Sequence, residues 1–230
     1  MDFNIFRDEK EIIDYIYGHP NRKVAQFTEH LTQIACLEGY DLIGLSVLTY
    51  FQFLFALLLS KKIKSMSNAK VVLGGPFITV YGERLFSQFP IGDYMIVGDG
   101  QVPLLRLIEH LKGRISVEAV PSLLYRQDGL IKANPREFFP IEDLHLPDFS
   151  DIPLDIYRSK IPIIEDMGLF LPYQITRGCT YNCSFCKRRV VNPVVEFKSY
   201  NKAVKELRAM KERYQSSLFF FGDDTINCSY

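Results

Sequence analysis

The sequence lacks an excess of charge of either sign. It carries 27 basic and 27 acidic residues among its 230, so no electrostatic feature predicts binding to nucleic acid or to a membrane surface. It also lacks a signal peptide at its start, so its five cysteines do not indicate the disulfide framework of a small secreted chain. These absences predict a cytoplasmic protein without a nucleic-acid partner.

Long apolar runs are equally scarce. The one candidate extends from Leu42 to Ser60 without a charged residue and is followed by the basic stretch 61–64, which approaches the ~20 residues of a membrane helix. Ser46, Thr49 and Gln52 are poor choices for the centre of a membrane. We therefore expect a buried strand followed by a buried helix, and no membrane span.

From residue 41 the pattern alternates between strands and helices. We expect helices before this point at 9–17 and 24–38, and then strands at 41–48, 70–73 and 93–97, separated by helices at 51–66, 79–88 and 102–111. This alternation predicts an α/β fold with a doubly wound parallel sheet. Such sheets bind ligands at the carboxyl ends of their strands.

Small residues follow each of these three strands. They are Ser46, Gly74, Gly75, Pro76, Gly98 and Gly100. Glycine permits a positive φ and the close approach of a ligand, although ordinary strand-to-helix turns favour the same residues. A nicotinamide cofactor is not expected, because Pro103 replaces the third glycine of the dinucleotide fingerprint and the motif follows the last strand instead of the first.

A hairpin and a proline-rich stretch follow. Asp128-Gly129 between two apolar runs is a strong hairpin signal, and prolines recur from 135 to 162. We expect a ligand-binding α/β domain at 1–115, a hairpin and linker at 116–168, and a third segment at 169–230. This last segment is expected to hold a strand from residue 171, a helix at 199–214 and a strand at 217–221. The apolar face of that helix is expected to comprise Tyr200, Val204, Leu207, Met210 and Tyr214.

Three cysteines lie within eight residues of the third segment. Cys179, Cys183 and Cys186 have the spacing C-x3-C-x2-C, and Phe185 precedes the last of them. A [4Fe–4S] cluster held by four cysteines mainly transfers electrons, whereas three cysteines leave one iron open to a substrate. Zinc would need a fourth ligand, and no second tight pair is present. A zinc site, an electron-transfer cluster and structural cysteines remain the alternatives.

The cysteine motif resembles the signature of radical S-adenosylmethionine (SAM) enzymes. The three strand-end motifs, in their order, resemble the cobalamin (B12)-binding domain that precedes many radical SAM cores. The sequence departs from that pattern at Phe77, where His is common, and at Asp99 and Gln101, where Glu is common. We find no opening strand and no D-x-H-x-x-G motif, and His19 does not fit one, so a histidine ligand to cobalt is not expected.

The resemblance implies a cobalamin-binding-like sheet followed by the start of a partial (β/α) barrel. It implies three cofactors, which are a [4Fe–4S] cluster, SAM and cobalamin. The cluster ligands would be Cys179, Cys183 and Cys186. The implied SAM contacts are Phe185, Gly222, Asp223 and Asp224, and either aspartate could accept a charge-assisted hydrogen bond from the SAM ammonium. The implied cobalamin contacts are Ser46, Gly74, Gly75, Pro76, Gly98 and Gly100.

The implied activity is reductive cleavage of SAM to a 5′-deoxyadenosyl radical, with methyl transfer or modification of a peptide or small molecule as outcomes. A flavodoxin or ferredoxin would supply electrons. No catalytic side chain is assigned. Because only two barrel strands precede Tyr230, we expect the front part of a longer enzyme. The alternatives are a non-catalytic fragment and a metal- or cluster-binding interaction domain.

Overall fold

The computed structural model describes residues 18, 22–37, 39–89, 92–157 and 169–226. The chain forms two compact units, Met1–Phe138 and Phe139–Tyr230. Each unit has a sheet and an apolar core of its own. The helix expected at 9–17 lies outside the described residues, whereas the next one is present as α2 (Arg22–Leu37).

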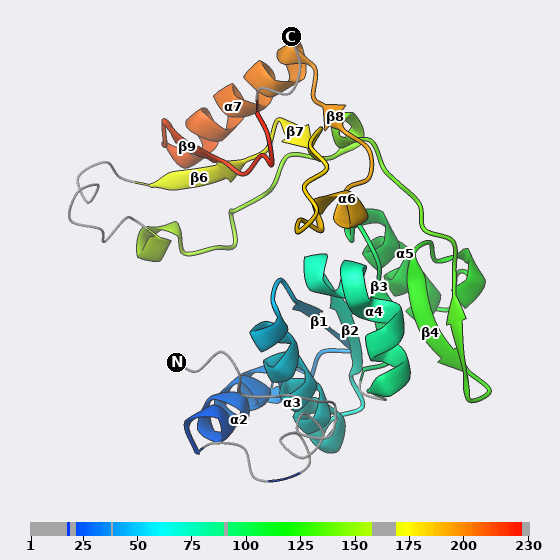
Figure 1. The fold of residues 1–230 in the computed structure, drawn as a ribbon. Coiled ribbons are helices and arrows are strands. Elements are labelled where there is room, and N and C mark those ends of the chain that lie inside the picture. Colours follow the sequence, from blue (N-terminus) through cyan, green and yellow to red (C-terminus); the bar gives the residue numbers. More distant parts are fainter. Residues whose placement is uncertain (1–17, 19–21, 38, 90–91, 158–168, 227–230) are drawn as a thin grey trace. The chain divides into compact units, whose positions relative to one another are not determined.

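The first unit contains a five-stranded sheet in the order β1-β2-β3-β4-β5 (Figure 1). Its strands are β1 (Leu42–Ser46), β2 (Lys70–Gly74), β3 (Tyr94–Ile96), β4 (Leu123–Gln127) and β5 (Leu130–Ala133). The first three strands are parallel neighbours, and the last two add to them as antiparallel strands. The predicted α/β fold is confirmed.

Helices cover both faces of this sheet. They are α3 (Tyr50–Met66), α4 (Pro76–Gln88) and α5 (Gln101–Leu111). Val71 and Leu73 pack with α3 and α4 in one core, whereas Val72, between them, packs with Leu107 of α5 in a second core. Because successive strand side chains point to opposite faces, the continuous apolar sequence of β2 serves both cores.

The apolar run 42–60 is divided between β1 and α3, as predicted. The polar residues inside it form the start of the helix, because Thr49 accepts a hydrogen bond from the Gln52 N–H in a capping box. The Gln52 side chain in turn accepts from the N–H groups of Leu48 (2.7 Å) and Thr49 (3.2 Å). No helix among the described residues is long and apolar enough to cross a membrane.

The hairpin belongs to the first sheet and not to a linker, which corrects the expected division at 115 and 168. Strand β4 pairs with β3, with Tyr94 opposite Tyr125, and the chain divides after Phe138. The described part of the proline-rich stretch packs into the second unit through Leu146 and Phe149. The local signal identified the hairpin correctly, but pairing with a distant strand leaves no local pattern.

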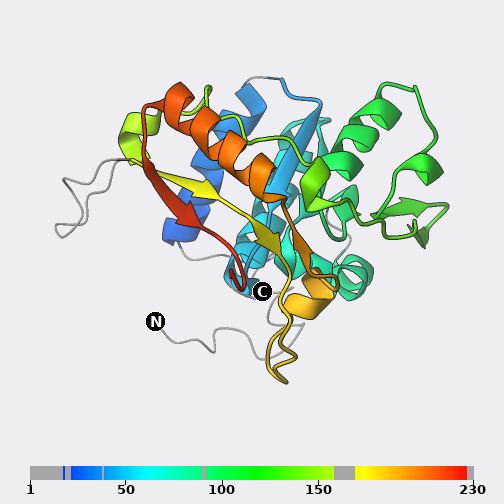
Figure 2. The ribbon, with the colours of Figure 1, turned by 90° about the horizontal axis from the view of Figure 1, so that it is seen from above.

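The second unit contains one strand–helix–strand element. Its parallel strands are β6 (Phe170–Tyr173) and β9 (Leu218–Phe221), and α7 (Tyr200–Tyr214) lies along them (Figure 2). Leu171, Ala203 and Met210 are buried between helix and strands. A second short pair, β7 (Thr176–Arg177) with β8 (Glu196–Phe197), brackets the cysteine loop, which includes the short helix α6 (Arg188–Val191).

Helix α7 differs from its expected apolar face. Val204 lines the outer side of the helix with Tyr200, and Ala203 is buried in the core instead. Tyr200 is 80% exposed, because it is the first residue after the N-cap Ser199 and lies at the end of the helix. Glu206, which is not part of that expected apolar face, is also buried. Its carboxylate is compensated by partners from other elements, and these partners cannot be identified from helical periodicity.

Candidate functional site

The small residues predicted at the strand ends lie together at one edge of the first sheet. Ser46 ends β1 directly opposite Gly74, which ends β2. The loop after β1 is fixed on its neighbour, since the Val47 N–H donates to the Gly74 carbonyl (2.8 Å) and the Phe77 N–H donates to the Val47 carbonyl (3.1 Å). The edge predicted for ligand binding is therefore formed.

Two of its glycines are required by the backbone. Gly75 has φ +99°, and a Cβ there would lie 2.6 Å from the Val47 carbonyl oxygen. Gly98 has φ +105°, and a Cβ there would lie 2.7 Å from Arg136 Nε. Sequence reasoning missed Thr79, whose hydroxyl accepts from the Gly98 N–H (3.0 Å) and donates to the Gly75 carbonyl (3.0 Å). Thr79 thus ties two of the three loops together.

Other positions at this edge are open. Ser46 and Gly100 are exposed, and nothing lies within 4 Å of a Cβ added at Gly100. A pocket of about 430 Å³ lies beside the edge, lined by α4, the end of β3 and the hairpin, with Thr79, Val97 and Arg136 among its residues. Open backbone at the carboxyl edge allows the close approach of a ligand. His19 lies outside the described residues.

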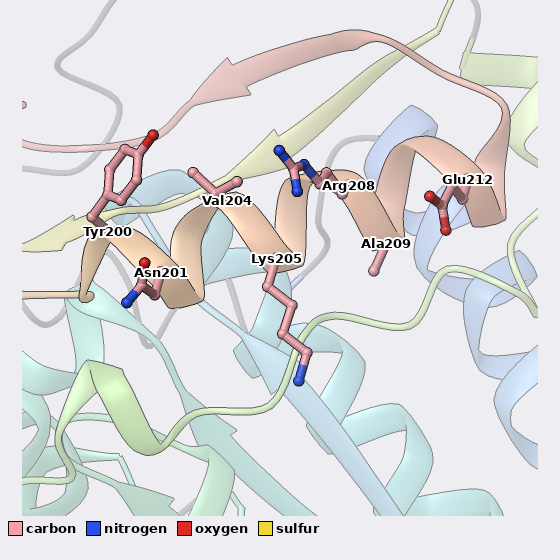
Figure 3. Close-up of a pocket in the computed structure, with 7 residues that line it drawn as sticks. All are labelled: Tyr200, Asn201, Val204, Lys205, Arg208, Ala209 and Glu212. Carbon is pink, nitrogen blue, oxygen red and sulfur yellow. The ribbon is translucent and has the colours of Figure 1, made fainter.

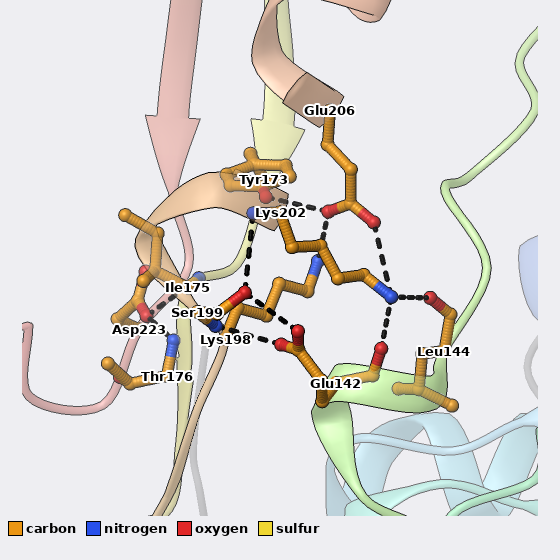
Figure 4. A network of polar contacts seen from close by, with 10 residues as sticks. All are labelled: Glu142, Leu144, Tyr173, Ile175, Thr176, Lys198, Ser199, Lys202, Glu206 and Asp223. Atoms are coloured by element: carbon orange, nitrogen blue, oxygen red, sulfur yellow. Dashed lines mark hydrogen bonds and ion pairs between the residues drawn. The ribbon is translucent and has the colours of Figure 1, made fainter. Parts of the chain in front are cut away.

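The acidic motif after β9 contacts the start of the cysteine loop. Asp223 Oδ1 accepts hydrogen bonds from the N–H groups of Ile175 (3.0 Å) and Thr176 (Figure 4). The Gly222 N–H donates to the Tyr173 carbonyl (2.9 Å). Asp223 therefore fixes the turn between β6 and β7, a role that a sequence pattern cannot distinguish from ligand binding.

Asp224 is paired differently. Its Oδ1 lies 3.1 Å from Arg188 Nε, and 9% of its side chain is exposed. The second carboxylate oxygens of Asp223 and Asp224 are buried and have no hydrogen-bond partner among the described residues. A buried carboxylate oxygen without a donor is costly, so these two atoms are suited to accept a hydrogen bond from a bound cationic group.

The cysteine loop begins at a glycine that no other residue can replace easily. Gly178 has φ +86°, and a Cβ there would lie 2.5 Å from the Val194 carbonyl oxygen. Cys179, the next residue, is half-buried, and its Sγ lies 3.0 Å from Thr225 Oγ1. No motif of the sequence singles out Thr225.

The other two cysteines are exposed. The Cys186 N–H donates to the Cys183 carbonyl (3.1 Å) in a turn, and Phe185 is 86% exposed. Within the ranges that the structure describes, no three His, Cys, Asp or Glu side chains are gathered as a metal site. Thiolates are nevertheless the ligands that iron–sulfur clusters use, and three of them lie on one loop. The expected cluster is therefore supported by the type and spacing of these residues and not by their present arrangement.

A buried charge network supports the end of this loop (Figure 4). Lys198 Nζ and the Tyr173 hydroxyl each lie 2.7 Å from Glu206 Oε2, and the side chains of Lys198 and Glu206 are 6% and 10% exposed. Lys202 Nζ lies 3.6 Å from the other Glu206 oxygen and donates to the carbonyls of Glu142 and Leu144.

The network shifts the pKa values of its members in opposite directions. Burial, and then the hydrogen bond to Glu206, raise the pKa of Tyr173. Burial acts to raise the pKa of Glu206. Hydrogen bonds from Lys198 and Tyr173 and the charges of the two lysines lower this pKa by more than burial raises it, so the net shift is downward. Glu206 is therefore held as a carboxylate.

A larger hollow of about 540 Å³ lies on the outer side of α7 (Figure 3). All seven residues that line it belong to this one helix, among them Tyr200, Lys205 and Arg208. None is a residue predicted to bind a cofactor. One helix alone does not enclose a ligand, since binding pockets bury most of the ligand's surface, so this hollow is not assigned a role.

Comparisons with known proteins agree with this geometry. Residues 6–108 match the B12 binding domain family, a range that begins ahead of the described residues, where the sequence shows no opening strand. The uncharacterized methyltransferase PH0819 of Pyrococcus horikoshii is 24% identical over 81% of the chain and 40% of its own length. The cobalamin-dependent radical SAM methyltransferase TokK of Streptomyces tokunonensis is 27% identical over 52% of the chain and 18% of its own length.

A solved structure of the radical SAM methyltransferase TsrM from Kitasatospora setae, with cobalamin and a [4Fe–4S] cluster bound, has the same fold. It matches 95% of the chain and 41% of its own length at a TM-score of 0.63 and 17% identity. The chain thus spans less than half the length of these relatives. Residues 6–108 are thus similar to B12-binding domains, and cobalamin-dependent radical SAM methyltransferases are among the relatives and structural neighbours of the chain.

Proposed function

We propose that the chain is the cobalamin- and cluster-binding part of a radical SAM methyltransferase. The observation that carries the proposal is the meeting of two motifs in the second unit. The Sγ of Cys179, the first cysteine of the loop, lies 3.0 Å from Thr225 Oγ1. Thr225 directly follows Asp223 and Asp224, and each of these aspartates keeps a buried oxygen without a partner among the described residues. An open cluster iron and an acceptor for an ammonium group are needed close together to hold SAM.

The cluster would be held by Cys179, Cys183 and Cys186. Thiolates are the ligands that iron–sulfur clusters use, and the exposure of the last two leaves their loop accessible. When bound, the cluster supplies the electron for reductive cleavage of SAM to a 5′-deoxyadenosyl radical, and cobalamin supplies a carrier for a methyl group. The β7–β8 pair and Gly178 fix the two ends of the loop.

Asp224 is the better candidate for the SAM ammonium. Asp223 Oδ1 already serves two backbone N–H groups, so its role is to position the turn. Asp224 pairs with Arg188, and such a neighbouring pair of opposite charges complements the ammonium and carboxylate of an amino acid. Phe185 and Gly222 complete the proposed SAM contacts.

Anaerobic reconstitution with iron and sulfide tests this proposal. We expect the dithionite-reduced chain to give a [4Fe–4S]⁺ electron paramagnetic resonance signal that changes when SAM is added. Cys183→Ala should abolish the signal, because only two thiolate ligands would remain, whereas Cys36→Ala, in α2, should leave it unchanged. A zinc-bearing chain without acid-labile sulfide would contradict the proposal. A cluster signal that SAM leaves unchanged would favour a non-catalytic cluster-binding module.

The cobalamin site is proposed at the open edge of the first sheet, with contacts from Ser46, Gly74, Gly75, Pro76, Gly98 and Gly100. Ser46→Tyr and Gly100→Tyr place bulk on this edge at exposed positions, where the fold has room. We expect each to weaken hydroxocobalamin binding at least about tenfold, a cost of about 1.4 kcal/mol, in a spectrophotometric titration.

Ser65→Tyr provides the matched control for this titration. Ser65 is exposed in the last turn of α3, and α3 starts at the carboxyl end of β1, so Ser65 lies toward the opposite end of the sheet. Cobalamin affinity should be retained in this variant. Equal affinities in all three variants would show that cobalamin, if it binds, does so elsewhere.

The partners of the reaction remain part of the proposal. We propose a small molecule or peptide as substrate, a flavodoxin or ferredoxin as electron donor, and the cytoplasm as location. Release of 5′-deoxyadenosine from SAM by the reduced chain would support an active enzyme. Cofactor binding without SAM cleavage would favour the alternative of a module that acts only with further protein segments.

A further inference from the structure

Thr225 occupies a position that neither the cysteine motif nor the acidic motif accounts for. It lies four residues after β9, and its hydroxyl is 3.0 Å from Cys179 Sγ. Cys179 is the one predicted cluster ligand that is half-buried, whereas the other two are exposed. The contact therefore joins the most fixed thiol of the loop to the end of the neighbouring strand.

The backbone of Thr225 is held independently of this contact. The Thr176 hydroxyl donates to the Thr225 carbonyl (3.2 Å), and Thr176 is itself buried with 1% of its surface exposed. The Thr176 N–H is held in turn by Asp223. Removing the Thr225 hydroxyl alone should leave the backbone in place, so its effect on the sulfur can be measured separately from an effect on folding.

The direction of the hydrogen bond follows from the state of the sulfur. A cysteine that ligates iron is a thiolate without a proton, so it can only accept, and the Thr225 hydroxyl must be the donor. A donor beside a ligating sulfur stabilises the more negative, reduced cluster, and hydrogen bonds to the sulfurs are among the factors that set cluster reduction potentials.

We propose that Thr225 is a positioning residue that donates a hydrogen bond to the Cys179 thiolate and thereby makes the cluster easier to reduce. This inference rests on the proposed function, because it requires that the cysteine loop holds a cluster. The electron comes from the external reductant, which is oxidised as the cluster takes up one electron. No bond of the protein forms or breaks in this step.

The test compares Thr225→Val, which keeps the shape but removes the hydroxyl, with Thr225→Ser, which keeps the hydroxyl. The full chain is reconstituted anaerobically and titrated with dithionite in the presence of redox mediators, and the [4Fe–4S]⁺ signal is quantified. In Thr225→Val we expect about a tenfold lower ratio of reduced to oxidised cluster at a given potential, or about 59 mV for a one-electron couple. Thr225→Ser should titrate like the unmodified chain.

Iron and sulfide contents distinguish the outcomes. Equal contents in the three proteins, together with the expected shift in Thr225→Val alone, would support the inference. Equal contents with three identical titrations would overturn the inference and leave the proposed function intact. Failure of the unmodified chain to assemble a cluster would overturn both. A lower iron content in Thr225→Val, with an unshifted potential for the clusters that form, would also overturn the inference, because Thr225 would then act in loop folding.

Discussion

Replacing Gly75 with alanine is expected to lower the free energy of unfolding of the first unit by about 3 kcal/mol. Gly75 has φ +99°, which alanine adopts only with strain. In addition, the new Cβ would lie 2.6 Å from the carbonyl oxygen and 2.9 Å from the nitrogen of Val47. These are backbone atoms, which cannot move aside without breaking the contact between the first two strand-end loops.

Gly100→Ala is the matched control for this prediction. Gly100 lies at the same edge, but its φ is −88° and nothing lies within 4 Å of the position that an alanine Cβ would take. Alanine there should change the stability by no more than about 1 kcal/mol, because it mainly reduces the freedom of the unfolded chain. Urea unfolding followed by circular dichroism, with hydrogen exchange of residues 42–48, measures both. Equal stabilities of the two variants would contradict the strain argument.

The second large effect is expected from Glu206→Gln. The Glu206 carboxylate neutralises Lys198 in a site where both side chains are at most 10% exposed. Glutamine keeps the shape and can still accept from the Tyr173 hydroxyl, but it leaves a buried ammonium group without its counter-charge. Breaking a buried ion pair from one side typically costs about 3–5 kcal/mol, and we expect a loss of this size in the second unit.

The double variant Lys198→Met/Glu206→Gln separates charge from packing. It removes both charges and keeps a hydrogen-bond acceptor for Tyr173, so most of the lost stability should return. Hydrogen exchange of residues 170–177 and 196–210 measures the effect in the unit concerned. A double variant no more stable than Glu206→Gln would show that packing of these side chains, and not the unpaired charge, is responsible.

The network also predicts a pH dependence. The pKa of Glu206 is lowered from its ordinary value of 4.5, so the folded state favours the carboxylate more than the unfolded state does. Its contribution to stability is therefore complete above pH 4.5 and is lost as the pH falls through the lower, folded pKa. The double variant should lack this component of acid sensitivity. Parallel acid titrations of both proteins would contradict the assignment.

Much of the fold followed from local patterns. The described α-helices and strands of the first unit were predicted within a few residues, because long periodic apolar patterns and glycine-containing strand ends specify them locally. The strand-end glycines also indicated the edge that we propose for ligand binding, since the ends of parallel strands meet at one edge of a sheet. The cysteine spacing indicated the proposed ligand set because all three residues belong to one short loop and are therefore close in the sequence.

Contacts between distant residues were decided only by the tertiary structure. The hairpin pairs with the first sheet through β3. Glu206 is buried where Lys198 and Tyr173 contact its carboxylate. Asp223 accepts a hydrogen bond from Ile175 in the turn after β6. Thr225 became a neighbour of Cys179 across 46 positions of the sequence. A sequence pattern records what each residue does within its own element. Which polar groups satisfy each other depends on how the elements pack, because burial is tolerated only where a partner from another element is in reach.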